Sequence, residues 1–240
     1  MLKKSAGIVL NHTRYGESSA IVHIFTREFG MRSYMVNGVL GKKKREKIIL
    51  LQPFNILELE VYNKDNREIN RIKEFHLSRQ LQNIPFSQER RAQSFFLIEI
   101  LSRVLKNENS NYKLYDFIAD AILFLDSDNE GIENFHLFFL FQLTSFLGIA
   151  PNGKNCGVFP YFDLQEGCFV NNEPFHTFFL PPSETNVFMR LFSIKNETLS
   201  QLAVNVQERK ILLKALVLFY ELHFPCTRKI RSIEVLSDLF

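Results

Sequence analysis

Three features of the 240-residue sequence predict an α+β protein, with a small closed β-barrel in residues 1–78 and an α-helical domain in residues 79–240. Short apolar, β-branched segments separated by turns fill the first part, whereas helix-like periodicity begins at about Leu77. The hydrophobic content of 46% is ample for buried cores. The charge divides at the same place, since residues 1–75 hold 14 Lys and Arg against 8 Asp and Glu, and residues 76–240 hold 15 against 18.

Five β-strands with turns between them are expected in the first domain. From Leu57 to Tyr62, apolar and polar residues alternate with the period of two that places one strand face in the core and the other in water. Gly30 ends a turn, where glycine supplies the positive φ that such turns often need. The expected strands are Ala6–Leu10, Ala20–Phe25, Met31–Val36, a long strand leading from Ile48 to Tyr62, and Ile69–Phe75. This density of short strands predicts a closed barrel.

Helical spacing of apolar residues predicts the second domain. Ser87–Leu105 and Asn111–Leu125 are expected to be amphipathic helices packed on a core. Phe135–Leu147 is apolar on nearly all sides and precedes Gly148, a good helix-ending residue, which predicts the central buried helix. Residues 149–182 are expected to be a loop-rich insertion. Helical patterns return in Ser183–Phe192, Thr198–Val204, Glu208–Phe224 and Ile233–Leu239.

Composition and motif content argue against several classes of protein. The three cysteines are an odd number and too few for the disulfide framework of a small secreted domain, which favours a reducing cytoplasmic setting. No apolar run approaches the roughly 18 residues of a membrane span, and the apolar N-terminal stretch is too short for a signal peptide. No H-E-x-x-H or G-x-S-x-G motif is present, so the sequence predicts a non-enzymatic protein without catalytic residues.

The most basic stretch of the chain, Gly41–Lys47, is the strongest candidate for a binding site. Neutralisation of phosphates by lysine and arginine supplies most sequence-independent affinity for DNA, so this run predicts an anionic partner. A charge run of this kind is equally typical of a solvated loop. The candidate DNA-binding residues are Lys42, Lys43, Lys44, Arg45 and Lys47 in the run, with Arg14, Arg27 and Arg32 extending a basic groove.

Four aromatic residues in the same half of the chain are candidates for base stacking. They are Tyr15, Phe29, Tyr34 and Phe54. Aromatic side chains on barrel platforms stack on successive bases of single strands. Taken singly, each of these residues is more typical of a hydrophobic core.

Several segments resemble the RecO family of bacterial recombination and repair mediators. They are Gly7–Leu10, Tyr15–Val22, Phe25–Gly30, Gly38–Lys44, Leu51–Phe54 and, less closely, Arg228–Ser232. The resemblance implies an OB-fold barrel followed by a helical domain, which binds single- and double-stranded DNA and anneals complementary strands. It also implies cooperation with RecR and single-stranded DNA-binding protein in loading the recombinase RecA.

Many members of that family carry a four-cysteine zinc module after the central helix, and this sequence departs from that pattern. The corresponding region offers Cys156, Cys168 and His176. A structural zinc site needs four ligands, usually as closely spaced pairs, so this set is one ligand short. We therefore expect no bound metal and no other cofactor, with a remnant of a metal site as the open alternative.

Two other functions stay open from the residues alone. The barrel could dock a protein partner as an interaction scaffold, with the basic run contributing only solubility. An OB-fold that binds RNA would use the same stacking and charge, because only contacts to the 2′-hydroxyl distinguish the two nucleic acids. Neither alternative involves a membrane.

Overall fold

The computed structural model describes residues 2–39, 45–64, 67–153 and 160–239. The chain forms two compact units, each of which has its own core. The barrel unit comprises Met1–Ser87 with Ile98–Ser127, and the helical unit comprises Gln88–Leu97 with Asp128–Phe240. The domain boundary expected between residues 78 and 79 stays a prediction.

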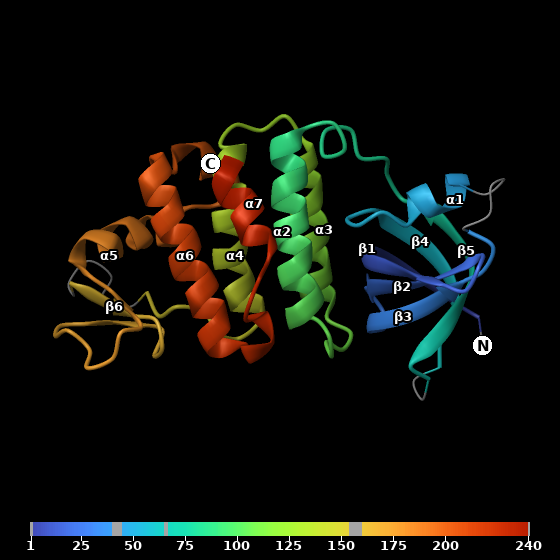
Figure 1. The fold of residues 1–240 in the computed structure, drawn as a ribbon, viewed down its shortest axis with the longest axis horizontal. Coiled ribbons are helices and arrows are strands. Elements are labelled where there is room, and N and C mark those ends of the chain that lie inside the picture. Colours follow the sequence, from blue (N-terminus) through green and yellow to red (C-terminus); the bar gives the residue numbers. More distant parts are fainter. Residues whose placement is uncertain (1, 40–44, 65–66, 154–159, 240) are drawn as a thin grey trace. The chain divides into compact units, whose positions relative to one another are not determined.

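Five strands form a closed barrel in the order β1-β2-β3-β5-β4 (Figure 1). They are β1 (Lys3–Tyr15), β2 (Ser19–Thr26), β3 (Gly30–Val36), β4 (Ile56–Tyr62) and β5 (Ile69–Leu77). The pair β3–β5 is parallel and every other pair is antiparallel. A five-stranded barrel of this kind, followed by helices, confirms the predicted α+β fold with an N-terminal OB-type barrel.

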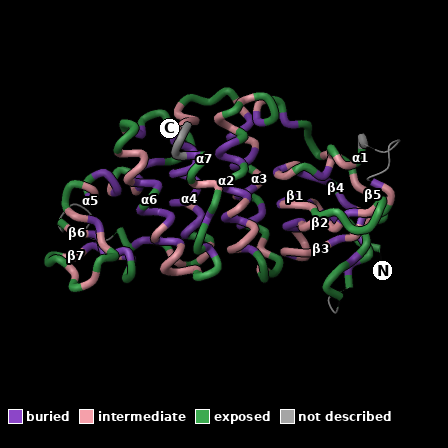
Figure 2. The backbone as a smooth tube through the Cα atoms, viewed as in Figure 1, coloured by how far each residue is buried: buried purple, intermediate pink, exposed green. Residues whose placement is uncertain are grey.

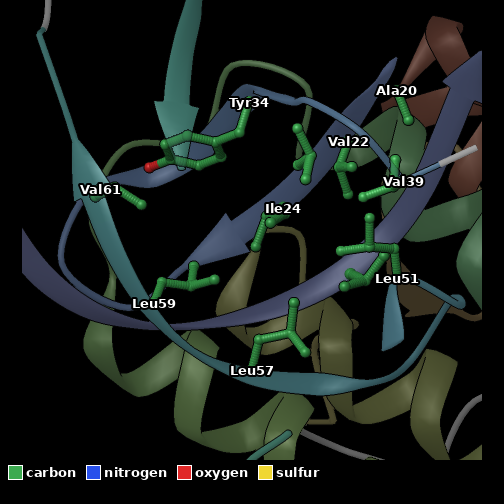
Figure 3. Close-up of a cluster of buried hydrophobic side chains, with 11 residues drawn as sticks. Ala20, Val22, Ile24, Tyr34, Val39, Leu51, Leu57, Leu59 and Val61 are labelled. Atoms are coloured by element: carbon green, nitrogen blue, oxygen red, sulfur yellow. The ribbon is translucent and has the colours of Figure 1, made fainter. Parts of the chain in front are cut away.

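Eleven buried side chains fill the barrel and define its core (Figure 3). Leu57, Leu59 and Val61 point inward from β4, as the alternation of that segment predicted. The Tyr34 ring lies among them, and its hydroxyl donates to Asn63 Oδ1 at 3.3 Å. Burial raises the pKa of the Tyr34 phenol, which therefore stays neutral.

The expected strand from Ile48 was wrong, because Arg45–Leu50 forms a helix, α1. Ile48 packs against the barrel core and Leu51 is fully buried. Leu51 directly follows α1, and its N–H donates to Ile48 O at 3.1 Å, so the turn of the chain continues to Leu51. Residues three apart lie on one face of such a turn but on opposite faces of a strand, which lets both side chains reach the core. Phe54, which has a φ of 70° and is buried, then reverses the chain into β4.

The β2–β3 turn is fixed to the segment that joins α2 (Gln88–Val104) to α3 (Tyr112–Asp126). Met31 N donates to Glu108 O at 2.9 Å, and Ser110 Oγ donates to Arg27 O at 3.1 Å. Gly30 occupies the closest point of this contact, with a φ of 69°. These bonds make α3 part of the barrel unit rather than a separate helix.

The Asp126 carboxylate at the end of α3 holds the segment that leaves the barrel. It accepts the backbone N–H groups of Gln82, Asn83 and Ile84 at 2.7, 2.8 and 2.9 Å. Backbone donors that leave a β-ladder need new acceptors, and a carboxylate can satisfy several at once. Asp126 therefore fixes the segment that connects β5 to α2 against the end of α3.

The helical unit is built around α4 (Phe135–Phe146), which is buried on nearly every side (Figure 2). This confirms the predicted central helix. Tyr220 of α6 (Val206–His223) donates its hydroxyl to Leu140 O at 2.9 Å, and Gly148, with a φ of 74°, follows the end of α4. The remaining elements are η1 (Ile132–Asn134), α5 (Pro182–Met189), η2 (Arg190–Ser193), η3 (Asn196–Gln201), η4 (Pro225–Thr227) and α7 (Ser232–Leu239).

The segment predicted to be loop-rich contains a small sheet in the order β7-β6-β8. Its strands are β6 (Tyr161–Asp163), β7 (Cys168–Val170) and β8 (Phe179–Leu180). The rings of Phe162 and Phe169 lie 4.9 Å apart, and Phe162 also packs on Phe188 of α5 at 4.7 Å. The aromatic cluster anchors these short strands, whose length alone gives too little periodicity for recognition in a sequence.

We expect Gly30→Ala to lower the free energy of unfolding by about 2 to 4 kcal/mol, because the added methyl group combines backbone strain with a clash. Its Cβ would overlap the backbone of Glu108 and Asn109. Urea titration measures the loss. The matched control is Gly16→Ala, at a φ of 66° with open space around the new Cβ, which should cost about 1 to 2 kcal/mol. Equal losses would show that the contact with residues 108–109 is not tight.

Candidate nucleic-acid interface

The segments that flank the basic run meet at one end of the barrel, which we call the loop end and define as residues 12–19, 37–39 and 45–51. Val39 N donates to Ser18 O at 2.8 Å, and Ser19 Oγ donates to Asn37 Oδ1 at 3.1 Å. His12 Nδ1 donates to Leu51 O at 3.1 Å. These bonds join the β1–β2 turn to the chain on both sides of the run.

The basic run itself is only partly within the described residues. Lys42, Lys43 and Lys44 lie outside them, and Arg45 is described only as the first residue of α1. Lys47 is exposed on α1. Because Val39 and Leu51 are fully buried in the barrel core, the chain leaves and re-enters the barrel at fixed points. The described segments on both sides of residues 40–44 therefore lie at the loop end.

Arg14 and Tyr15 lie at the loop end, on the last residues of β1. The Arg14 side chain is exposed and its Nε donates to Gly16 O at 3.1 Å. The Tyr15 side chain is 53% exposed. The Arg14 guanidinium and the Tyr15 ring are thus carried by consecutive residues, at the same end of the barrel as Lys47.

Arg27 lies at the other end of β2. Arg14 pairs with Ala20 and β2 continues to Thr26, so about 20 Å of strand separates the two arginines. Arg27 Nε and Nη2 donate to the Asp116 carboxylate at 2.8 and 3.0 Å, and the guanidinium lies 5.0 Å from the Tyr112 ring centre. The side-chain hydrogen bond raises the pKa of Arg27 and lowers the pKa of Asp116. This arginine joins β2 to α3.

Arg32 of β3 is half-buried, and its Nη1 donates to Met31 O at 2.9 Å. It lines a cavity of about 510 Å³ with residues of β2, of the segment before β5 and of the C-terminal end of α2. The structure therefore brings Arg14 and Lys47 to the loop end, and places Arg27 and Arg32 away from it. The DNA-binding role of all eight predicted residues stays a prediction.

An acidic face of the barrel was not found by sequence reasoning. Glu28, Glu58, Glu60 and Glu74 line a shallow cavity of about 420 Å³ at the seam of β1, β4 and β5. Lys73 Nζ lies 2.9 Å from a Glu60 oxygen, so part of the basic charge is neutralised there. Alternation within β4 turns Glu58 and Glu60 away from the barrel core, but only the pairing of β4 with β5 adds Glu74 to them.

The aromatic candidates divide between core and surface. Tyr34 and Phe54 are buried, which confirms the core interpretation for both. Phe29 is partly buried against the barrel core, with Lys3 Nζ 5.2 Å from its ring centre. Tyr15 is the exposed member of the four. It is therefore the candidate that can present a free ring face to a base.

The residues considered for a metal site are engaged in other bonds. His176 Nε2 donates to Asp163 Oδ2 at 3.1 Å, and its Nδ1 accepts from Phe178 N at 3.2 Å. Both ring nitrogens are used, so His176 is not free to bind a metal in this arrangement. Cys168 is a free thiol, and Cys156 lies outside the described residues. Within residues 2–39, 45–64, 67–153 and 160–239, no group of three potential ligands comes together.

In that same described part of the chain, no helix combines the length and apolar character needed to cross a membrane.

Two family models match the sequence. The model described as "Recombination protein O N terminal" matches residues 1–81, and the model described as "Recombination protein O C terminal" matches residues 85–229. The matches therefore extend over both the barrel and most of the helices.

Full-length relatives give the same result. A protein named DNA repair protein RecO from Phocaeicola vulgatus is 33% identical over 240 residues, which is 100% of both chains. The protein of that name from Flavobacterium psychrophilum is 34% identical over 99% of this chain and 98% of its own. The one from Porphyromonas gingivalis strain W83 is 34% identical over 100% of both.

Proposed function

The chain belongs to the RecO family of DNA repair proteins, and we propose that it is a recombination mediator that binds single- and double-stranded DNA and anneals complementary strands. The observation that carries the proposal is that Arg14, Tyr15 and Lys47 lie at the loop end, where the described segments on both sides of residues 40–44 also lie. That end combines fixed positive charge with an exposed ring.

The physical basis of binding is phosphate neutralisation by the loop end. A nucleic-acid strand that meets several lysines and arginines releases its condensed counterions, which supplies affinity without regard to sequence. The acidic face at the seam of β1, β4 and β5 repels phosphates, so the strand approaches from the loop end. Stacking of bases on Tyr15 adds affinity for single strands, whose bases are accessible.

Annealing follows from the same charges. Two complementary strands repel one another, and a cationic surface that holds one strand lowers the repulsion that the second strand meets. Base pairing then supplies the free energy of the reaction, so nucleotide hydrolysis is not required. We therefore propose a non-enzymatic protein without a cofactor.

The proposal includes two protein partners, and the basis for both is membership of the family. We propose that the protein works with RecR and with single-stranded DNA-binding protein when it helps to load the recombinase. Strands covered by a binding protein are the substrate that a mediator meets, so annealing of such covered strands is the activity to measure.

The first test is annealing of complementary oligonucleotides covered with the cognate single-stranded DNA-binding protein. We expect the purified protein to raise the annealing rate above the spontaneous rate without ATP, because base pairing drives the reaction. Quenching between dyes on the two strands measures the rate. A matched pair of RNA strands tests the RNA-binding alternative. An unchanged rate for DNA would contradict the proposed function, and a requirement for hydrolysed ATP would contradict its non-enzymatic mechanism.

The second test removes three charges from the run. Replacing Lys43, Lys44 and Arg45 by Ala should flatten the plot of log K against log salt concentration by roughly 2 units for single strands, at about 0.7 per phosphate contact. The stability of the barrel should change by no more than about 0.5 kcal/mol. Fluorescence anisotropy at several salt concentrations measures both affinity and slope.

The matched control for charge removes three cations near the acidic face, by replacing Lys3, Lys4 and Lys73 with Ala. It should leave the salt slope close to that of the unmodified protein. If the run variant and the control variant behave alike, the run is a solvated loop and the DNA-binding surface lies elsewhere.

The third test concerns Tyr15. Tyr15→Ala should weaken binding of single-stranded DNA by about 1 to 3 kcal/mol for one stacked base. The chain contains no tryptophan, so Tyr15→Trp gives a protein with a single indole whose fluorescence reports stacking directly. We expect DNA to quench it. The control is Tyr62→Trp, because Tyr62 is 47% exposed and lies at the opposite end of the barrel. Equal quenching at both positions would remove Tyr15 from the interface.

A further inference from the structure

The cavity lined by Arg32 lies within the barrel unit and away from the run. Asn11 of β1 and Ser33 of β3 contribute to it from the barrel, and Arg67 contributes from the segment before β5. Ser102 and Lys106 contribute from the C-terminal end of α2 and the turn that follows. Its volume of about 510 Å³ is within the range of cavities that hold small ligands.

Positive charge dominates the described lining of this cavity. Arg32, Arg67 and Lys106 are its basic residues, and Glu68 is the one carboxylate among the lining residues that the structure describes. His23 also lines the cavity, where burial lowers its pKa and its Nδ1 is hydrogen-bonded to Ser33 Oγ at 2.9 Å. An anion is therefore the ligand that this lining favours.

Two lining residues add hydrogen-bonding capacity that the fold leaves unused. Asn11 Oδ1 and Ser102 Oγ are buried and have no hydrogen-bond partner among the described residues. Buried polar atoms are normally satisfied, so such an atom beside a cavity indicates a missing ligand or water. A hydroxyl can donate to an oxyanion, and an amide presents either its oxygen or its nitrogen after rotation of the group.

We propose that this cavity is a second phosphate-binding site, which takes a phosphate group of a nucleic-acid strand; the identity of the strand rests on the proposed function. Guanidinium groups match the geometry of phosphate oxygens, and the Lys106 ammonium adds a point charge. A carboxylate ligand would engage fewer donors than the three cations and the hydroxyl provide. The site combines barrel residues with the end of α2, so a strand bound there reaches beyond the loop end.

The test compares two double variants that remove the same charge. Arg67→Gln with Lys106→Gln alters the cavity, whereas Arg71→Gln with Lys113→Gln alters an exposed arginine and an exposed lysine of the same unit that do not line it. We expect the cavity variant to bind single-stranded DNA about ten-fold more weakly, with a salt slope flatter by roughly 0.7 for each lost phosphate contact. The control variant should stay close to the unmodified protein, and thermal unfolding verifies that both fold.

A second measurement uses inorganic pyrophosphate as the probe, without DNA. In the unmodified protein, the backbone amide signals of Ser33 and Ser102 should shift in a saturable manner by NMR. In the cavity variant, the same signals should not shift. Absence of saturable shifts in the unmodified protein would overturn the site.

The outcomes separate this inference from the proposed function. If DNA binding depends on the run and the two double variants bind DNA equally, the function stands and the cavity is not a strand site. If the protein binds no DNA but pyrophosphate shifts the cavity signals, the proposed function fails and the cavity is a site for small phosphates. If the cavity variant loses DNA affinity and the control variant does not, the result supports both the proposed function and the cavity as a strand site.

Discussion

Closure of the barrel through β1 is the constraint on which the rest of the barrel unit depends. The first half of β1 pairs with β4 and the second half with β2, with a register shift between Val9 and Asn11. Gly7 lies where these halves overlap, and a Cβ there would come within 2.5 Å of Ile24 Cγ2 and 2.7 Å of Leu59 Cδ1. The loop end, the acidic face and the position of Asn11 all follow from this one strand.

Local patterns predicted most of the fold because strands and helices leave a period in the sequence. The alternation of β4 and the continuous apolar character of α4 gave elements whose burial agrees with the prediction. The α1 helix was missed because its six residues are too few to display a period, and its geometry is decided by where Ile48 and Leu51 meet the core. The strands of the small sheet, which have two or three residues each, were not predicted for the same reason.

The candidate site was harder to predict because contacts between residues far apart in the sequence decide which charged side chains are paired and which charged side chains lie close together. Arg27 is paired with Asp116, which is 89 residues away, so nothing near Arg27 in the sequence signals that its charge is engaged. The cavity likewise joins Arg67 to Lys106 only through the packing of α2 against the barrel. The basic run could be found from composition because its charges are consecutive in the sequence, and Arg14 is an exposed residue near the end of β1.

The separation of the acidic face from the loop end gives the barrel an electric dipole along β1. Glu58 and Glu60 lie opposite Ala6 and Lys4 near the start of that strand, where Lys4 and Lys73 offset part of the acidic charge. Arg14 lies near the other end of the strand. In the field of a polyanion such a dipole experiences a torque that turns the cationic end forward before contact, which raises the fraction of productive collisions. At an ionic strength of 0.1 M the field decays over about 10 Å, shorter than the barrel, so this orientation is lost as salt increases. We therefore expect salt to slow the encounter with DNA that the proposed function requires.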